Sequence, residues 1–500
     1  MEPHSLSLTP IDIAADSLGF FRWGHVAGGV LVSNDAGDWA LLSEDEFADV
    51  LAGRVVEGHP RFADLQRKGI IRDGLDLDAL TARIAQRNRH MRRGPHVHVV
   101  TLTRGGPAAS ANGGGDGAGA DMSTETAEGV VEFALQSTSP ALTFELQGEQ
   151  GEPLHNVAVL RHLVETAQTR CKHTVGKSLT FRVLTNLTAM TEAHAEWLLA
   201  NDVEVVVRLD GPAAIHDANR AWTQAAAHAD VVRWIELFQR RQAELARPTA
   251  VPISAVVTAT RRVLDDWQAV VDEYVARGLR SIYFQPLHAA RVDPATWATI
   301  GYTPAEYLDR YRRILEYVVE QNRRGVDLIE RTAAVVATKI LTAADTGAVD
   351  LQSPNGGGSG QIAYGVDGRI FPDDDALRVD ADGDPIFLLG DVRSLSPSEL
   401  VRHPTVRAIA SASLLDAQPM CADCWNKPFC GYSPVRNFIT QGDLVGQRPH
   451  CFECKHHMGV SSQLFEWLAG GDDSESAQIL RRWVQSPARL VDGRLSLPPR

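Results

Sequence analysis

Residues 96–102, with the sequence HVHVVTL, decide the fold, because they are the first of six short apolar runs that alternate with amphipathic segments. The five further runs are ALTFEL at 141–146, LTFRVL at 179–184, VEVVVRL at 203–209, PISAVV at 252–257 and SIYFQPL at 281–287. Patterns typical of helices lie between them, as at 126–137, 157–167, 191–201 and 232–246. Short strands joined by helices pair in parallel. The sequence therefore predicts an α/β fold over 93–345, built as an open or closed β/α barrel.

A small module precedes this region, at residues 1–92. The stretch FFRWGHVAGGVLVSN at 20–34 predicts two strands around Gly28 and Gly29. The following stretch LSEDEFADVLAG at 42–53 predicts a helix with Ser43 as its N-cap, and further helical patterns follow at 60–69 and 76–88.

The C-terminal region divides in two. After helical patterns at 303–325 and 332–345, the chain becomes rich in turns and short strands from Ser353, and we place a separate domain at 346–470. A last helix at 476–485 and a polar tail make up 471–500.

Five of the six cysteines fall in this C-terminal domain: Cys421, Cys424, Cys430, Cys451 and Cys454. Two residues between cysteines let both sulfurs turn to one side, so this spacing is typical of a metal site. In a reducing compartment, clustered cysteines serve as ligands more often than as disulfides. The lone Cys171 is interpreted as a bystander thiol.

Composition restricts the function classes. The chain has 500 residues, of which 44% are hydrophobic and 22% charged, which is typical of a multidomain globular protein. A net charge of -14 and a pI near 5.6 argue against nucleic acid or an anionic membrane as a partner. There is no apolar run of about 18 residues and no basic segment followed by an apolar one at the start, so we expect a cytoplasmic protein.

Seven motifs in a fixed order carry a family resemblance. They are HVHVVTL, DMSTETA, LQGEQGEPLHN, TNLTAM, RLDGPAAIHDANR, NGGGSGQIAYGVDGRIFP and CADCWNKPFCGYSPVRNFITQGD. This order resembles the radical S-adenosylmethionine (radical SAM) peptide maturases with a SPASM-type C-terminal domain, most of all the larger maturase of the His-Xaa-Ser peptide system. The resemblance implies a partial (β/α)6 radical-SAM-like barrel, an N-terminal winged-helix-like peptide-recognition module and a C-terminal cysteine-rich SPASM-like domain.

The chain departs from the family at the cofactor site. The family needs a CxxxCxxC motif after the first strand, to hold a 4Fe-4S cluster that donates an electron to S-adenosylmethionine. The corresponding stretch here begins at Arg104 and contains no cysteine. The family's Gly-Gly-Glu-Pro turn reads GEQGEP at 148–153, with two residues inserted, and Arg208 stands where a small polar residue is usual.

Two acidic residues are candidate cofactor contacts by this resemblance, Glu152 and Asp210. Gly-Glu-Pro and Leu-Asp-Gly-Pro are good turn formers whatever the function, and we favour that interpretation. A guanidinium at Arg208 would repel the sulfonium of S-adenosylmethionine. The resemblance thus implies a copy that does not cleave this cofactor.

The chain keeps the cysteine ligands of one of the family's two auxiliary clusters and lacks those of the other. Positions that would hold one cluster are occupied by Ser359, Asp373 and Ser433. The other cluster keeps its ligands, namely Cys421, Cys424 and Cys430 with either Cys451 or Cys454 as the fourth. We expect one 4Fe-4S cluster there. The alternative is a zinc ion held by the pairs Cys421–Cys424 and Cys451–Cys454, which leaves Cys430 spare.

Three further features have a simpler interpretation beside the functional one. His450, His456 and His457 flank the distal cysteines but are expected to be solvated. The carboxylates Asp373–Asp375 are expected to form a solvated turn rather than a cation site. The glycine-rich stretch 105–119 has no Walker spacing and is expected to be a disordered loop rather than a phosphate cradle.

The leading functional hypothesis is a component of a ribosomal-peptide maturation system that binds a precursor peptide, or an active radical SAM maturase, without cleaving S-adenosylmethionine itself. One alternative is an active or electron-relaying oxidoreductase of the radical SAM family. A further alternative is a zinc-stapled scaffold.

Overall fold

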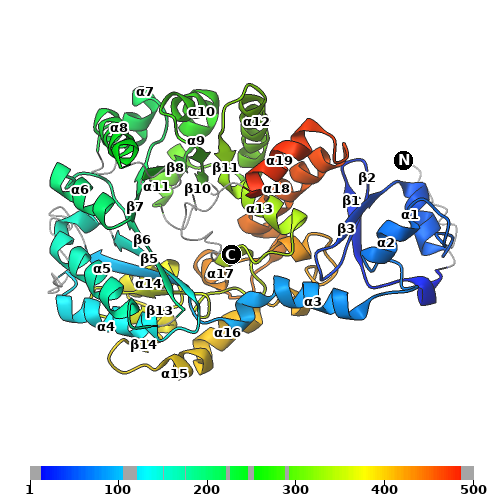
Figure 1. Cartoon of the computed structure of the whole chain (residues 1–500), viewed down its shortest axis with the longest axis horizontal. Coiled ribbons are helices and arrows are strands. Elements are labelled where there is room, and N and C mark those ends of the chain that lie inside the picture. Colours follow the sequence, from blue (N-terminus) through cyan, green and yellow to red (C-terminus); the bar gives the residue numbers. More distant parts are fainter. Residues whose placement is uncertain are drawn as a thin grey trace.

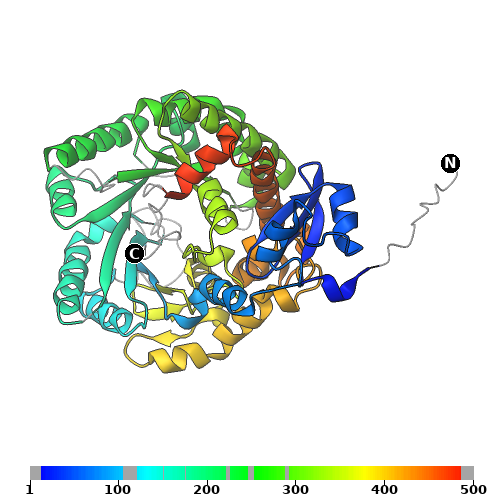
Figure 2. The same ribbon diagram turned by 45° about the vertical axis from the view of Figure 1, so that its right-hand side comes forward.

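The computed structural model describes residues 13–104, 121–149, 151–174, 176–220, 226–245, 253–287 and 292–485. A curved central sheet lies inside a ring of helices, and the N-terminal module projects from one side of this body (Figures 1 and 2). The glycine-rich stretch 105–119 lies outside the described residues.

The six apolar runs form parallel neighbours in the central sheet, in chain order, as predicted. Their strands are β4 (Val97–Thr103), β5 (Ala141–Gly148), β6 (Ser178–Leu184), β7 (Val203–Arg208), β8 (Ile253–Ala259) and β10 (Phe284–Pro286). The sixth run is split, because β9 (Ser281–Ile282) pairs with β11 (Ile329–Glu330) instead of with β8. Helices follow the strands and cover the outside of the sheet: α4 (Thr124–Leu135), α5 (Val157–Cys171), α6 (Glu192–Ala200), α7 (Ala213–Arg220), α8 (His228–Glu244), α9 (Arg261–Asp265) and α10 (Trp267–Ala276).

The two faces of the barrel sheet differ in chemistry. Successive side chains of a strand point to opposite faces. Phe144 and Phe181 stack and pack with the helices in the main hydrophobic core. The alternate residues Glu145, Arg182 and Glu204 are register partners on three neighbouring strands and lie on the inner face. Arg182 donates a hydrogen bond to Glu204, so the interior of the barrel carries paired charges.

The central sheet continues into the C-terminal domain. Strand β12 (Gln361–Tyr364) pairs in parallel with β4, and β13 (Arg369–Phe371) and β14 (Gly390–Asp391) extend the sheet in antiparallel fashion. The barrel and the cysteine-rich domain therefore share one nine-stranded sheet. Short strands in this domain were expected, but their pairing with the first barrel strand was not.

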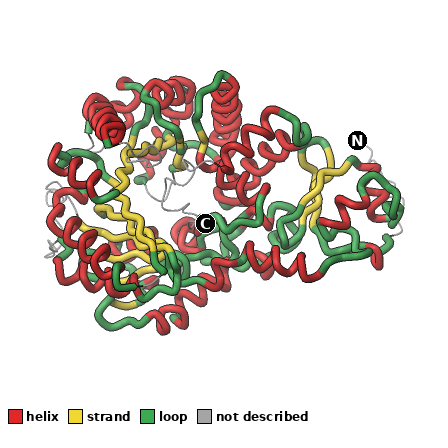
Figure 3. The backbone as a smooth tube through the Cα atoms, in the orientation of Figure 1, coloured by secondary structure: helices red, strands yellow, loops and turns green. Residues whose placement is uncertain are grey.

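The N-terminal module has three antiparallel strands rather than two, β1 (Arg22–Val26), β2 (Gly29–Ser33) and β3 (Trp39–Leu42). Its helices are α1 (Glu44–Leu51), α2 (Phe62–Arg67) and α3 (Leu77–Arg87). Ser43 caps α1 as predicted, in a capping box with Glu46. Ala27 and Gly28 have φ of 55° and 74°, which gives the tight two-residue turn of a hairpin. A separate hydrophobic core holds the module together, and its sheet stands apart from the central sheet (Figure 3).

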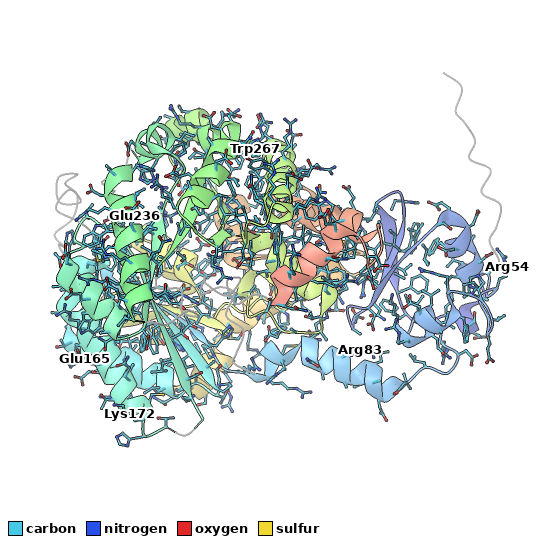
Figure 4. The ribbon with its side chains drawn as sticks, turned by 45° about the horizontal axis from the view of Figure 1, so that its top comes forward. Arg54, Arg83, Glu165, Lys172, Glu236 and Trp267 are labelled. Atoms are coloured by element: carbon cyan, nitrogen blue, oxygen red, sulfur yellow. The ribbon has the colours of Figure 1, made fainter. Side chains whose placement is uncertain are left out.

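The module is docked onto the rest of the chain through polar contacts. Ser33 Oγ donates to the carbonyl of Trp425 at 2.6 Å, and Trp39 Nε1 donates to the carbonyl of Ile340 at 3.0 Å. Helix α3, on which Figure 4 labels Arg83, leads from the module toward the barrel. Arg87 ends this helix and is 9% exposed.

Helices complete the C-terminal half. They are α11 (Pro294–Ile300), α12 (Pro304–Arg323), α13 (Arg331–Leu341), α14 (Asp374–Ala381), α15 (Pro397–Arg402), α16 (Pro404–Ser413), α17 (Pro434–Gln441), α18 (Phe452–Leu468) and α19 (Glu475–Gln485). Trp483 on α19 donates to Asn322 on α12 at 3.2 Å, which fixes the last described helix against the body. No helix among the described residues combines the length and the apolar character that crossing a bilayer requires.

Candidate functional site

Consecutive turns position the first three cysteines of the C-terminal cluster. The amide of Cys424 donates to the carbonyl of Cys421 at 3.1 Å, and the amide of Lys427 donates to the carbonyl of Cys424 at 3.0 Å. A 3-10 turn at Lys427–Phe429 then leads into Cys430. The CxxCx5C run therefore winds tightly, which keeps its three thiols in one neighbourhood.

The two distal cysteines differ in their surroundings. Cys451 precedes α18 and is 3% exposed, and its thiol donates to Glu453 Oε2 at 2.9 Å and lies 3.7 Å from Asn437 Oδ1. Burial and Glu453 together raise the pKa of Cys451 to about 12. Cys451 is thus engaged with oxygen partners.

Cys454 stands in the first turn of α18 and acts electrostatically on two thiols of the CxxCx5C run. Burial raises the pKa of Cys421 to about 11, with further contributions from Cys454 and Cys424. Burial also raises the pKa of Cys430, and Cys454, Cys424 and Cys421 each add to that rise. The thiols of Cys421, Cys424, Cys430 and Cys454 therefore influence one another electrostatically.

A buried arginine lies against Tyr432, two residues after Cys430. Arg448 is 6% exposed, and its guanidinium carbon lies 3.3 Å from the ring centre of Tyr432. Burial raises the pKa values of Cys421 and Cys454, and the positive charge of Arg448 partly opposes this rise.

This donor set fits a metal–thiolate centre. Across the described part of the chain, no three His, Cys, Asp or Glu side chains are already arranged around a metal position. Four thiolates around Zn²⁺ or an iron–sulfur cluster form an anion. Cysteine is therefore a suitable donor type for such a centre, but the described thiols as placed do not already surround a metal position.

Glu152, the first candidate cofactor contact, is fully engaged inside the protein. It is 1% exposed, and its carboxylate accepts hydrogen bonds from Thr185 Oγ1 and the Asn186 amide, both at 2.6 Å, and from the Leu154 amide at 3.2 Å. Burial raises its pKa. These contacts connect the loop after β5 to the end of β6.

Asp210, the second candidate, is also engaged. It is fully buried and accepts from Asn219 Nδ2 at 2.7 Å, Arg220 Nε at 2.6 Å and the Thr258 amide at 2.7 Å. The carboxylate therefore ties the loop after β7 to α7 and to β8. Both candidate residues have structural roles in the described geometry.

Arg208 ends β7 on the inner face of the barrel sheet, two residues before Asp210. Its Nη1 donates to Thr258 Oγ1 at 2.9 Å and to Gln285 Oε1 at 3.1 Å. The side chain is exposed. A cation thus lies at the carboxyl ends of β7, β8 and β10, where ligands bind in parallel β/α folds.

An ion network lies beside two of the positions expected to have lost a cluster, Asp373 and Ser433. Arg436 Nη2 lies 2.8 Å from Asp350 Oδ2, and its Nε lies 3.0 Å from Asp375 Oδ2. Ser433 caps α17 and Asp373 caps α14 through their side chains. A narrow cavity among these residues is lined by Val349, Asp350, Asn355, Gly357, Gln361, Asp373, Asp374, Asp375 and Arg436.

Two expectations about polar side chains are wrong. Asp373–Asp375 do not form a solvated turn, because Asp375 is 2% exposed and paired with Arg436, and burial raises the pKa of Asp373 to about 7. His456 and His457 are buried on α18 rather than solvated, whereas His450 is exposed. His457 Nδ1 lies 3.1 Å from the carbonyl of Gly431 and 3.8 Å from Cys430 Sγ.

Sequence reasoning missed Arg448 and Arg436. Both stand close to cysteines in the sequence, but many surface arginines do so. Their roles depend on burial and on long-range partners, such as Tyr432 for Arg448 and Asp350 for Arg436.

Comparison with known proteins rests on structure. No protein-family model and no curated protein matches the sequence. A polyhistidine-tagged form of anSMEcpe with bound AdoMet matches at a TM-score of 0.62 and 16% identity, over 78% of this chain and 98% of that chain. The chain shares the fold of anSMEcpe. Native anSMEcpe with bound AdoMet and Cp18Cys peptide gives a TM-score of 0.59 at 16% identity, over 75% and 98% of the two chains.

SuiB of Streptococcus suis matches at a TM-score of 0.49 and 12% identity, over 87% of this chain and 98% of that chain. The expected α/β fold is confirmed by the fold shared with anSMEcpe, a protein solved with bound AdoMet, while the radical SAM assignment, the link to the His-Xaa-Ser system, the winged-helix assignment and the SPASM assignment stay predictions.

Proposed function

We propose that this chain is a component of a ribosomal-peptide maturation system that binds peptide and holds one metal centre but does not cleave S-adenosylmethionine. The observation that carries this proposal is the contrast between two sites on one maturase-like fold. Residues 104–121 contain no cysteine, and Glu152 and Asp210 are engaged in internal hydrogen bonds. The C-terminal domain nevertheless keeps five cysteines, of which Cys421, Cys424, Cys430 and Cys454 influence one another electrostatically.

The proposed ligands are Cys421, Cys424, Cys430 and Cys454. Cys451 is the less suitable fourth ligand because its thiol is engaged with Glu453 and Asn437. A 4Fe-4S cluster bound there would supply one-electron chemistry, and a zinc ion would supply structural stability only. The inclusion of Cys430 in the group favours the CxxCx5C ligand set over two CxxC pairs.

Peptide binding is proposed for the N-terminal module. The module exposes two large apolar side chains at β1, Phe20 at 62% and Trp23 at 51%. Strand β1 lies at one edge of the three-stranded sheet, where an extended peptide can add a strand. The anSMEcpe structure with Cp18Cys peptide supports peptide as the ligand class of this fold.

The metal centre is tested by anaerobic purification and analysis of iron, sulfide and zinc. We expect about four irons and four sulfides per chain for one 4Fe-4S cluster. Cys421→Ala and Cys454→Ser should both lose the metal, and Cys451→Ser, the matched control, should keep it. Loss in Cys451→Ser with retention in Cys454→Ser would overturn the ligand set. One zinc without iron would favour the scaffold alternative.

The absence of cofactor cleavage is tested separately. The loaded protein is incubated anaerobically with S-adenosylmethionine and dithionite, and 5′-deoxyadenosine is measured. We expect no product above that of the heat-denatured protein. Turnover that depends on the chain would support the active oxidoreductase and overturn the proposal.

A further inference from the structure

One face of the N-terminal module lies against the CxxCx5C run. Arg22 on β1 donates from Nε to the carbonyl of Ala422, which stands between the first two cysteines. Ser33 on β2 donates from Oγ to the carbonyl of Trp425 at 2.6 Å. Both acceptors are main-chain atoms of the run. Two strands of the module therefore hold the backbone on which the first two cysteines lie.

Ion pairs join the module to the run at the same place. Lys427 Nζ lies 2.8 Å from Asp35 Oδ1, and Arg22 Nη1 lies 2.9 Å from the same oxygen. Lys427 also pairs with Asp416, which precedes the run. The side chains of Lys427 and Arg22 are 7% and 4% exposed, so solvent screens these pairs less than it would on an open surface. Asp35 of the module is thus shared by one cation of the module and one cation of the run.

Apolar side chains extend this contact. Val26 and Leu31 of the module belong to the main hydrophobic core. The same core contains Trp425 and Phe429 of the run. Gly24 on β1 leaves no room for a side chain, because an added Cβ would lie 2.3 Å from Trp425 Cδ1. The module sheet therefore packs closely on the run.

The other face of β1 belongs to the proposed peptide site. Side chains alternate along a strand, so Trp23 and His25 point away from the run. Trp23 is 51% exposed, and its ring centre lies 5.2 Å from that of Phe47 on α1. Among the described residues β1 pairs with β2 alone, which leaves its second edge open to an added strand. One strand thus separates an occupant of this site from the cysteines.

We propose that β1 couples the peptide face of the module to the CxxCx5C run: the docked strand shields Cys421 and Cys424, and changes on its outer face alter how often the run opens. This inference rests on the proposed peptide site of the module. A peptide strand added at the free edge stabilises the docked position of β1, which lowers the fraction of open run. Linkage makes this effect reciprocal, so a closed run favours peptide binding.

The test measures cysteine alkylation in the full chain, without peptide and after treatment with EDTA under reducing conditions. N-ethylmaleimide is added, and mass spectrometry follows the rate at each cysteine relative to Cys171, which lies on α5 of the barrel. Arg22→Met should accelerate Cys421 and Cys424 at least about tenfold on this scale. Burial raises the pKa of Cys424 and the positive charge of Arg22 partly opposes this rise, so loss of the charge alone would slow alkylation there. An acceleration therefore reports opening of the run.

Two further variants test the coupling through β1. Trp23→Ala removes the contact with Phe47 on the outer face, and it should accelerate the same two cysteines roughly three- to tenfold. Arg54→Gln is the matched control, because Arg54 pairs with Asp49 at the surface of the module, and its rates should stay within about twofold of the parent. Unchanged rates in Trp23→Ala, beside accelerated ones in Arg22→Met, would show that the module covers the run without transmitting events on its outer face, and this overturns the proposal.

The outcomes also separate this inference from the proposed function. The assay contains neither metal nor peptide, so its result does not depend on cluster loading or on peptide binding. Unchanged rates of Cys421 and Cys424 in Arg22→Met would overturn the inference and leave the metal centre and the peptide site standing. If Arg22→Met unfolds the whole chain, so that Cys171 accelerates equally, Ser33→Ala decides. This variant removes a single hydrogen bond to the run and should accelerate both cysteines about threefold, and equal rates in Ser33→Ala and the parent would then overturn the proposal.

Discussion

Replacement of Arg87 should release the N-terminal module from the body of the protein. Arg87 is buried at the end of α3, and burial lowers its pKa to about 10. Its guanidinium donates to the carbonyls of Ala36 at 3.1 Å, Pro428 at 2.9 Å, Lys339 at 2.8 Å and Thr342 at 3.2 Å. Three of these four acceptors lie outside the module. Lys339 is on helix α13, Thr342 directly follows that helix, and Pro428 is in the cysteine-rich domain.

The magnitude follows from these contacts. A hydrogen bond from a charged donor contributes about 1.5–3 kcal/mol, and removal of one member of a buried charged network costs about 3–5 kcal/mol in total. Arg87→Met leaves the four carbonyls without their donor. At 1.4 kcal/mol per factor of ten, the equilibrium for undocking of the module should increase roughly 100- to 4,000-fold.

The connection between module and barrel provides the assay. Arg89, Arg92 and Arg93 are trypsin sites in and next to a short 3-10 turn between α3 and β4. A protease cleaves extended chain, so the cleavage rate follows the open population when opening is fast. Native-state trypsin cleavage, with fragments identified by mass spectrometry, should accelerate at least 100-fold in Arg87→Met.

Arg83 provides the control, because it lies one turn earlier on the same helix and binds Asp38 at 2.9 Å within the module. This pair is partly exposed, and its loss should cost less than about 1 kcal/mol. Equal cleavage rates in Arg87→Met and Arg83→Gln would show that Arg87 does not hold the module in place.

Three further predictions concern stability measured by urea unfolding. Arg436→Met should lower the free energy of unfolding by about 3–5 kcal/mol, because buried Asp375 loses its ion pair with Arg436; Arg436→Lys should lose less. Glu330 is fully buried, and burial raises its pKa from 4.5 to about 7. Between pH 4.5 and pH 7 the unfolded state therefore binds fewer protons than the folded state, so the free energy of unfolding falls by about 3 kcal/mol as pH rises over this range. Glu330→Gln should remove this fall, so that the variant gains on the parent at pH 8 relative to pH 4.5, and an unchanged difference would contradict the assignment. Gly24→Ala should cost about 1–3 kcal/mol, because an added Cβ would lie 2.3 Å from Trp425 Cδ1.

Local patterns predicted the barrel well. Each of the six runs forms strand structure in the central region, because apolar runs bounded by helical patterns fit a sheet buried on one face by helices. Ser43 was predicted as a cap because its chemistry depends on residues only three positions away.

Long-range features could not be predicted in this way. The pairing of β12 with β4 joins Gln361 to Val97, and nothing in the four-residue strand specifies that partner. Trp39 in β3 lies outside the elements predicted from the sequence, and it packs on Phe465 at a ring-centre distance of 5.0 Å. His456 reads as solvated beside Lys455, but it lies 5.3 Å from the ring of Tyr307.

The same limit applies to the candidate site. Cysteine spacing indicated a metal centre, but only the three-dimensional surroundings distinguish Cys454 from Cys451 through the contact with Glu453. Sequence similarly indicated Glu152 and Asp210 by position. Their partners, such as Thr185 and Arg220, show how each carboxylate is used.

The C-terminal domain is stabilised in two ways that do not need a bound group. A buried apolar cluster includes Phe371, Phe387 and Val435. Arg436 is paired with Asp350 and Asp375, so this ion network is complete without a metal. A metal–thiolate centre, by contrast, depends on metal supply and on pH. Removal of metal from the proposed centre should therefore weaken the cysteine-bearing turns and leave the core and the Arg436 network in place, which ties the proposed centre to one part of the domain.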